Sequence, residues 1–222
     1  MDSVQPNFVT KRELAVAYLR RLLTTGQVRP FDRIRIRDVA LHLRISDTPV
    51  REAIKQLVSE GLLMETAHVG ATVPYYSAED IQEVMEMRAV LAALAITLNA
   101  PLVTPDTIAR LDELIADGQA ALQAGDVSRY RTINRDFHAV VRDLGPYEFL
   151  KRTLQTLSDR SRFADFNLLP NRMAESHAEH QQIRDALAEG RFADAADITR
   201  AHELAALPAL LRYASERATD PT

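Results

Sequence analysis

The sequence predicts a mostly α-helical protein in two parts, a small N-terminal domain of three helices and a β-hairpin, and an all-α antiparallel helical bundle. Apolar residues recur at helical spacing along most of the chain, and residues typical of turns interrupt them at short intervals. Two short strand-like runs flank a turn at residues 67–70, and no β-type alternation follows residue 77. The formal charge is +3 over residues 1–76 and −7 over residues 77–222, which together make the net −4. A mildly basic N-terminal segment before an acidic C-terminal segment indicates a small N-terminal domain that contacts a polyanion.

The N-terminal domain, residues 11–76, has the element order of a winged helix-turn-helix. Its first helix carries the apolar residues Leu14, Val16, Tyr18, Leu19 and Leu22. The run "RPFDRIRI" is expected to be a turn before the second helix, in which Val39, Ala40 and Leu43 face inward. The expected elements are a flexible arm (1–10), helices (11–25, 37–43 and 46–60) and a hairpin with its turn at 67–70.

The helix predicted over residues 46–60 begins and ends sharply. Ser46 is a suitable N-cap, and Gly61 lies just past the end. One face carries an apolar stripe, made of Val50, Ile54, Leu57 and Val58. The opposite face is polar, with Asp47, Thr48, Arg51, Lys55 and Gln56. Such a mixed face either only contacts solvent or reads a ligand such as DNA.

Residues 77–217 are predicted to form six helices with short connectors, which is typical of an antiparallel bundle. Ser77 and Asp80 provide the cap and first-turn acid for the first of them. The expected helices cover residues 78–99, 105–124, 127–144, 147–166, 171–189 and 192–217, with a frayed tail at 218–222.

Composition excludes several classes of protein. The chain has 222 residues and no cysteine, which excludes disulfides, thiolate metal ligands and thiol nucleophiles. The longest nearly apolar stretch, residues 89–100, is too short to span a bilayer, and the N-terminus lacks the apolar run of a signal peptide. We therefore expect a cytoplasmic protein without a membrane partner.

Several motifs make the chain resemble a known family. The run "ISDTPVREAIKQLVSEGLL" (45–63) resembles the GntR family of bacterial winged-helix transcription regulators, and "GAT" (70–72) resembles the wing of that family. In the helical part, "NRDFH" (134–138), "EHQQIRDAL" (179–187) and "ITRAHELA" (198–205) resemble the FCD effector domain of FadR-type regulators, in its shorter six-helix, VanR-like form.

The resemblance implies that the 46–60 helix enters the major groove of double-stranded DNA. Arg51 would then read a base, because a guanidinium can bind guanine O6 and N7 together. The other expected contacts are Arg37, Thr48 and Lys55, with His68 and Gly70 at the wing tip near the minor groove. Asp47 departs from the family, which commonly has arginine there. It either accepts a hydrogen bond from cytosine N4 or stabilises the N-terminus of the helix.

Three histidines of the helical part are candidates for a metal site. Asn134 and His138 are four residues apart and share a helix face, and His180 and His202 lie on two consecutive helices that would pack antiparallel. Three imidazoles and an amide oxygen would suit Zn²⁺ or Ni²⁺. The resemblance implies a metal site made of these three histidines and an acidic residue at the position of Asn134. The alternative is that they are ordinary buried histidines.

A neutral ligand set would leave more positive charge on the ion and favour an anionic effector, such as a carboxylate. Arg88 and either Arg160 or Arg162 could steer that anion, or could instead form structural salt bridges. His177 could line the same cavity.

The leading hypothesis is a ligand-responsive transcription regulator, a homodimer on a pseudo-palindromic operator. The resemblance implies repression that the effector relieves. One alternative is a metalloenzyme with a DNA-binding appendage, but the chain has no "HExxH" or "GxSxG" motif, and its helical half has no Glu-x-x-His. We therefore expect no enzyme activity. A second alternative is an architectural DNA-binding protein, which would leave the histidine pocket unused.

Overall fold

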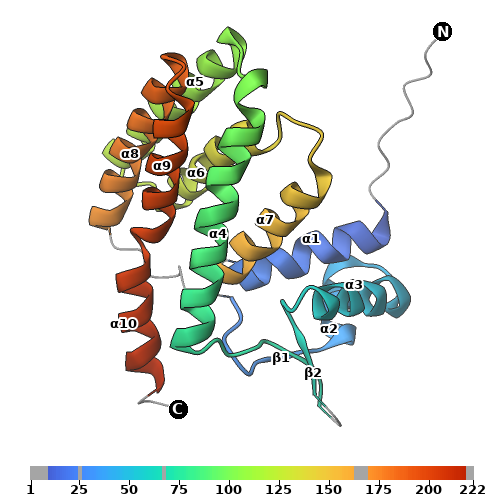
Figure 1. The fold of residues 1–222 in the computed structure, drawn as a ribbon. Coiled ribbons are helices and arrows are strands. Elements are labelled where there is room, and N and C mark those ends of the chain that lie inside the picture. Colours follow the sequence, from blue (N-terminus) through green and yellow to red (C-terminus); the bar gives the residue numbers. More distant parts are fainter. Residues whose placement is uncertain (1–9, 25–26, 67–68, 163–169, 219–222) are drawn as a thin grey trace, which may run out of the picture. The chain divides into compact units, whose positions relative to one another are not determined.

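The computed structural model describes residues 10–24, 27–66, 69–162 and 170–218. The chain divides into two compact units, Met1–Tyr76 and Ser77–Thr222. Figure 1 shows the helices and strands of both. Apart from Thr10 and Ala218, the predicted arm and tail lie outside the described residues. In the described part of the chain, we find no helix that is both long and apolar enough to cross a membrane.

The first unit contains three helices and a three-stranded antiparallel sheet. The helices are α1 (Lys11–Thr24), α2 (Ile36–Leu43) and α3 (Asp47–Ser59), and the strands are β1 (Arg33–Ile34), β2 (Met64–Thr66) and β3 (Gly70–Thr72). The sheet order is β1-β3-β2, with Ala71 opposite both Ile34 and Glu65. The predicted hairpin is therefore present. The short strand β1 was expected to be a turn, because two residues are too few to show alternation.

The core of the first unit forms where α1 packs against α3. Leu19 and Leu23 of α1 and Val50 and Leu57 of α3 are almost fully buried. Leu14 was expected in this core but is 42% exposed. The buried stripe of α1 includes Leu19 and Leu23, which are four residues apart, and Leu14 lies one residue off this spacing.

The helix α3 begins and ends where its sequence predicts. Ser46 occupies the N-cap position with an extended backbone, but its side chain makes no capping hydrogen bond. At the other end, Gly61 has a φ of +73°, a conformation that glycine adopts without steric cost. The amide of Leu62 then donates to the carbonyl of Leu57 at 2.9 Å, which closes the helix end.

The second unit is an all-α bundle. It contains α4 (Ala78–Asn99), the 3₁₀ turn η1 (Ala100–Leu102), α5 (Pro105–Gln123), α6 (Val127–Arg142), α7 (Glu148–Arg162), α8 (Pro170–Ala188), α9 (Phe192–Leu204) and α10 (Leu207–Ala218). Ser77 and Asp80 form a reciprocal capping box at the start of α4.

The predicted sixth helix over residues 192–217 is in fact two helices, so the described residues of this unit form seven α-helices. The interruption falls at residues 205–206, directly before Leu207 and Pro208. Proline lacks an amide hydrogen, and its ring collides with the carbonyl four residues earlier, so a single helix cannot continue through Pro208.

The packing of the bundle brings distant helices together. The helix α4 packs along α9 and α7, and α8 packs against both α5 and α9 (Figure 1). The core between them is apolar and includes Leu111, Phe137, Ile183 and Ala195. His138, His180 and His202 therefore reach one another from three different helices.

Candidate functional site

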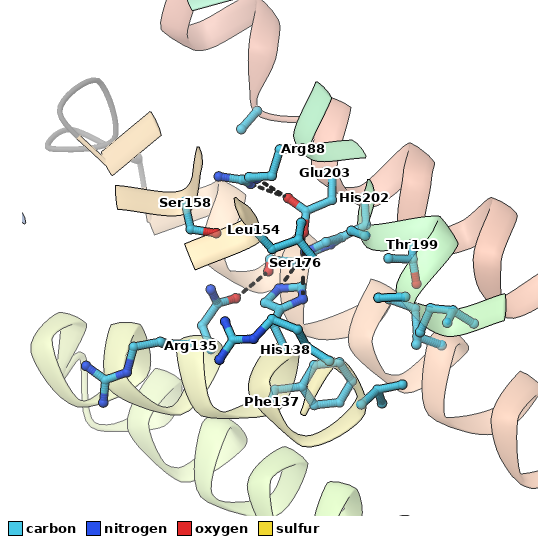
Figure 2. Close-up of a pocket in the computed structure, with 18 of the residues that line it drawn as sticks. Arg88, Arg135, Phe137, His138, Leu154, Ser158, Ser176, Thr199, His202 and Glu203 are labelled. Atoms are coloured by element: carbon cyan, nitrogen blue, oxygen red, sulfur yellow. Dashed lines mark hydrogen bonds and ion pairs between the residues drawn. The ribbon is translucent and has the colours of Figure 1, made fainter. Parts of the chain in front are cut away.

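Three histidines converge inside the second unit. His138 comes from α6, His180 from α8 and His202 from α9. The Nε2 atom of His138 lies 3.3 Å from that of His180 and 3.1 Å from that of His202. One candidate ligand atom from each ring lies within 4.8 Å of the other two. The structure therefore brings together the three histidines that the sequence singled out. Figure 2 shows two of them, His138 and His202.

The imidazole of His180 is held by packing. Its ring is buried and stacks on Phe137, with centroids 4.0 Å apart and planes 14° apart. Phe137 precedes His138 on α6, so one turn of this helix both provides a histidine and fixes the orientation of another.

Glu179 contacts the nitrogen of His202 that lies away from His138. The Oε2 atom of Glu179 lies 2.6 Å from Nδ1 of His202. Burial alone would raise the pKa of Glu179, but hydrogen bonds from His202 and Arg172 outweigh it and lower this pKa to about 2. An ionised carboxylate only accepts hydrogen bonds, so Nδ1 of His202 is the donor to Glu179, while Nε2 lies 3.1 Å from Nε2 of His138.

Two of these histidines, His138 and His180, are electrically neutral at physiological pH. Burial lowers the pKa of His138 to about 3 and the pKa of His180 well below its ordinary value. Metals bind neutral imidazole, so little proton release is needed at these two rings. A set of three imidazoles suits Zn²⁺, Ni²⁺ and similar borderline divalent ions.

Asn134 lies one turn before His138 on α6 and lines the same cavity. Its Oδ1 accepts a hydrogen bond from Ser176 Oγ at 3.3 Å. Neither this amide nor the three imidazoles carries a negative charge at neutral pH. A divalent ion held here would keep its full positive charge for another ligand.

A cavity of about 150 Å³ adjoins the histidines. At 10–15 Å³ for each water-sized position, this is room for roughly ten non-hydrogen atoms. Its wall contains apolar residues such as Ile96 and Leu154 beside five arginines, and Glu203 is the only acidic side chain lining it among the described residues. The arginines are Arg88, Arg131, Arg135, Arg142 and Arg172. The cavity therefore favours a small anion.

Arg88 reaches the cavity from α4 and binds residues of two other helices. Its Nε donates to Glu203 Oε2 at 2.5 Å, and its Nη1 donates to the hydroxyl of Ser161. Burial is the largest single influence and alone would raise the pKa of Glu203, but the charges of Arg88, His138 and His202 and the hydrogen bond from Arg88 together lower this pKa to about 2. The Oε1 atom of the same carboxylate lies 3.8 Å from Nδ1 of His138.

Two expected effector contacts lie elsewhere. His177 packs in the contact between α8 and α5, where a Cβ added to Gly118 would lie 3.2 Å from its Nδ1, and its ring meets Tyr130 edge-on. Neither His177 nor Arg160 is among the described residues that line the cavity. His177 lies three residues before His180, so the two side chains are turned about 60° from each other around the axis of α8. The side chain of Arg162 lies outside the described residues.

The polar face of α3 is available to a ligand. Asp47, Thr48, Arg51 and Lys55 are all exposed there, opposite the buried stripe, and Arg37 is exposed on α2. Asp47 lies in the first turn of α3, where its charge favours the helix. Gly70 is exposed at the start of β3 with a φ of +97°, and His68 lies outside the described residues.

Sequence reasoning missed the roles of Glu179, Glu203 and Arg172. Both glutamates are adjacent in sequence to a histidine of the cluster, so a signal existed, but adjacent helix residues point in different directions. The contact of Glu179 with His202 and that of Glu203 with Arg88 instead join different helices. Arg172 and Glu179 are seven residues apart, two turns along one face of α8, and this spacing is the sequence signal for their ion pair.

Comparisons with known proteins agree with this architecture. Residues 11–73 match the model described as "Bacterial regulatory proteins, gntR family", and residues 83–205 match the FCD domain. The chain is 31% identical over 176 residues to the Nta operon transcriptional regulator of Aminobacter aminovorans, covering 78% of this chain and 82% of that protein. It is 32% identical over 123 residues to the regulator McbR of Escherichia coli K12, covering 55% of this chain and 56% of McbR.

Among solved structures, the fold is similar to that of E. coli McbR/YncC, with a TM-score of 0.80 and 23% identity. This match covers 92% of the present chain and 99% of the other.

Proposed function

Because the chain belongs to the GntR family of bacterial regulatory proteins, with an FCD domain after its DNA-binding domain, we propose that it is a repressor controlled by a small anionic metabolite. It is a transcription regulator and not an enzyme. We place it in the cytoplasm, where it meets DNA. The observation that carries the proposal is the convergence of three imidazoles beside an arginine-lined cavity.

In this proposal, His138, His180 and His202 hold a divalent ion, and Asn134 is the fourth candidate ligand. Such an ion would supply a concentrated positive charge that favours a carboxylate effector beside these residues. The arginines of the cavity wall orient the rest of the anion through charge-assisted hydrogen bonds. The size of the cavity limits the effector to roughly ten non-hydrogen atoms.

Operator binding is assigned to the exposed face of α3. We propose that Arg51 reads a base and that Arg37, Thr48 and Lys55 contact bases or phosphates, with Gly70 and His68 at the wing tip. The effector changes operator affinity only if it binds one arrangement of the two units more tightly than another. Repression that the effector relieves is the mode implied by the resemblance described above.

We also propose that the protein is a homodimer on a pseudo-palindromic operator. Support comes from α4, where Met87, Val90 and Leu94 are 46%, 49% and 42% exposed at helical spacing. Such an apolar stripe is costly in water, and a second copy of the chain would cover it. Val90→Glu should turn a dimer into a monomer in light scattering, and a variant that stays dimeric would refute this interface.

The experiment that tests the DNA-binding assignment compares Arg51→Ala with Arg110→Ala, which removes the same charge from an exposed arginine of the helical unit. Operators are first selected from random DNA, and affinities for selected and unrelated DNA are then measured at one stated salt concentration. Arg51→Ala should lose about 1–3 kcal/mol of discrimination. Arg110→Ala should behave as wild type. Unchanged discrimination in Arg51→Ala would show that this helix face does not read the operator.

The effector assignment is tested by adding mono- and dicarboxylates of increasing length to the operator complex, in the presence of Zn²⁺ or Ni²⁺. Release of DNA by small carboxylates, and not by neutral analogues of equal size, is the expected result. Equal release by both would refute an anionic effector.

A further inference from the structure

One carboxylate outside the histidine cluster binds directly to a ring that belongs to it. Glu179 lies on α8, and its Oε2 is 2.6 Å from Nδ1 of His202 on α9. That nitrogen is on the far side of the ring from Nε2, which faces His138 at 3.1 Å. Glu179 therefore contacts the cluster without occupying a ligand position.

The position of Glu179 is itself fixed by Arg172. The guanidinium of Arg172 donates to both carboxylate oxygens of Glu179, at 2.9 Å from Nη1 and 2.6 Å from Nη2. Nη2 also lies 3.3 Å from the backbone carbonyl of His202. A bidentate pair restricts a carboxylate much more than a single bond does, and here it is anchored to both α8 and α9. Arg172 is 12% exposed, so solvent competes little for these bonds.

The histidine cluster lacks the negative charge that commonly accompanies a divalent ion. Its candidate ligands are three imidazoles and the amide of Asn134, none of which is an anion. A carboxylate that accepts a hydrogen bond from the remote nitrogen of a ligating histidine makes the ring a stronger donor and fixes its tautomer. Glu179 has this geometry, whereas Glu203 lies 3.8 Å from Nδ1 of His138, beyond hydrogen-bond distance.

We propose that Glu179, held by Arg172, is the positioning residue of the metal site: it fixes His202 with Nε2 free to bind the ion and supplies the charge that Asn134 does not. This inference rests on the proposed function for the part that concerns metal affinity. Its other part, the tautomer of His202, holds in the metal-free protein as well.

The chain offers a matched control for the test. Glu175 lies one turn before Glu179 on α8, 3.5 Å from the same Arg172, and its side chain is 66% exposed. Glu179→Gln and Glu175→Gln therefore remove the same charge from the same helix, next to the same arginine. Only the first substitution changes the group bound to His202.

Two measurements on the full-length chain decide the proposal. The first is competition for Zn²⁺ against a chelator, in which Glu179→Gln should weaken binding 10- to 100-fold and Glu175→Gln should match wild type. The second is the ¹⁵N chemical shifts of the His202 ring in the metal-free protein at pH 8, assigned with His202→Gln. Wild type should show one tautomer with the proton on Nδ1, and Glu179→Gln should show a mixture.

The outcomes are distinguishable. The proposal would be supported if Glu179→Gln loses affinity for Zn²⁺ and shows a mixed tautomer while its melting temperature equals that of Glu175→Gln. Wild-type affinity or an unchanged tautomer in Glu179→Gln would overturn it. If wild type binds no metal, the metal part of the proposed function fails, and the tautomer measurement alone decides whether Glu179 positions His202.

Discussion

Adding a divalent metal ion should stabilise the helical unit by an amount that can be worked out in advance. A ligand that binds only the folded state at a free concentration of one hundred times its Kd contributes about 2.7 kcal/mol. The unit Ser77–Thr222 has 146 residues. At about 2.1 cal/mol/K per residue, its unfolding entropy is about 0.3 kcal/mol/K, so the expected rise in Tm is about 9 °C.

The assay is differential scanning calorimetry of the full-length chain, stripped with a chelator and then titrated with Zn²⁺ or Ni²⁺. The rise should appear in the transition of the helical unit, while a separate transition of the Met1–Tyr76 unit should stay where it is. His138→Ala should remove most of the rise, because Nε2 of His138 lies within 3.3 Å of both other rings.

No rise with Zn²⁺, Ni²⁺, Co²⁺ or Mn²⁺ would refute a metal site at these histidines. An equal rise in wild type and in His138→Ala would place the bound ion elsewhere on the chain. In either case the DNA-binding assignment would stand, since all of its residues belong to the unit Met1–Tyr76.

Three further predictions concern stability, and each is measured by urea unfolding. Gly145→Ala should destabilise the helical unit by about 1–3 kcal/mol, because the added Cβ would lie 2.2 Å from Oδ1 of the buried Asn99; wild-type stability would mean that this contact relaxes freely. Ser77→Ala should cost about 1 kcal/mol by removing the capping box with Asp80, and no loss would mean that water replaces it. The metal-free protein should lose stability as pH falls from 6.5 toward 3, because the unfolded chain binds a proton at His138 that the folded protein excludes until about pH 3. A pH-independent unfolding free energy between pH 7.5 and 5 would contradict the last prediction.

The sequence determined by itself those features that depend on neighbours along the chain. Helix ends are local, because a cap such as Ser77 or a glycine such as Gly61 satisfies backbone groups of its own helix. The whole of α4 could therefore be predicted. The break before Pro208 was also local and could have been read, but the apolar spacing on both sides of it favoured one long helix.

The candidate histidines were also predictable, because spacing along α6 and the order of α8 and α9 restrict where the rings can meet. Tertiary structure alone decided which charged residues join them. Whether His177 or His180 faces His138 depends on the rotation of α8, which the packing of Phe137 and Ile183 sets.

The same holds for the charges. Glu179 lies on α8 and binds His202 on α9, and Arg88 lies on α4 and binds Glu203, 115 residues away. The way the apolar faces of two helices pack determines which acid contacts which base between them. Successive residues of a helix point about 100° apart, so a shift of one residue moves a side chain to another face. The sequence gives the spacing of apolar residues along each helix, and only packing determines how far neighbouring helices are rotated relative to one another.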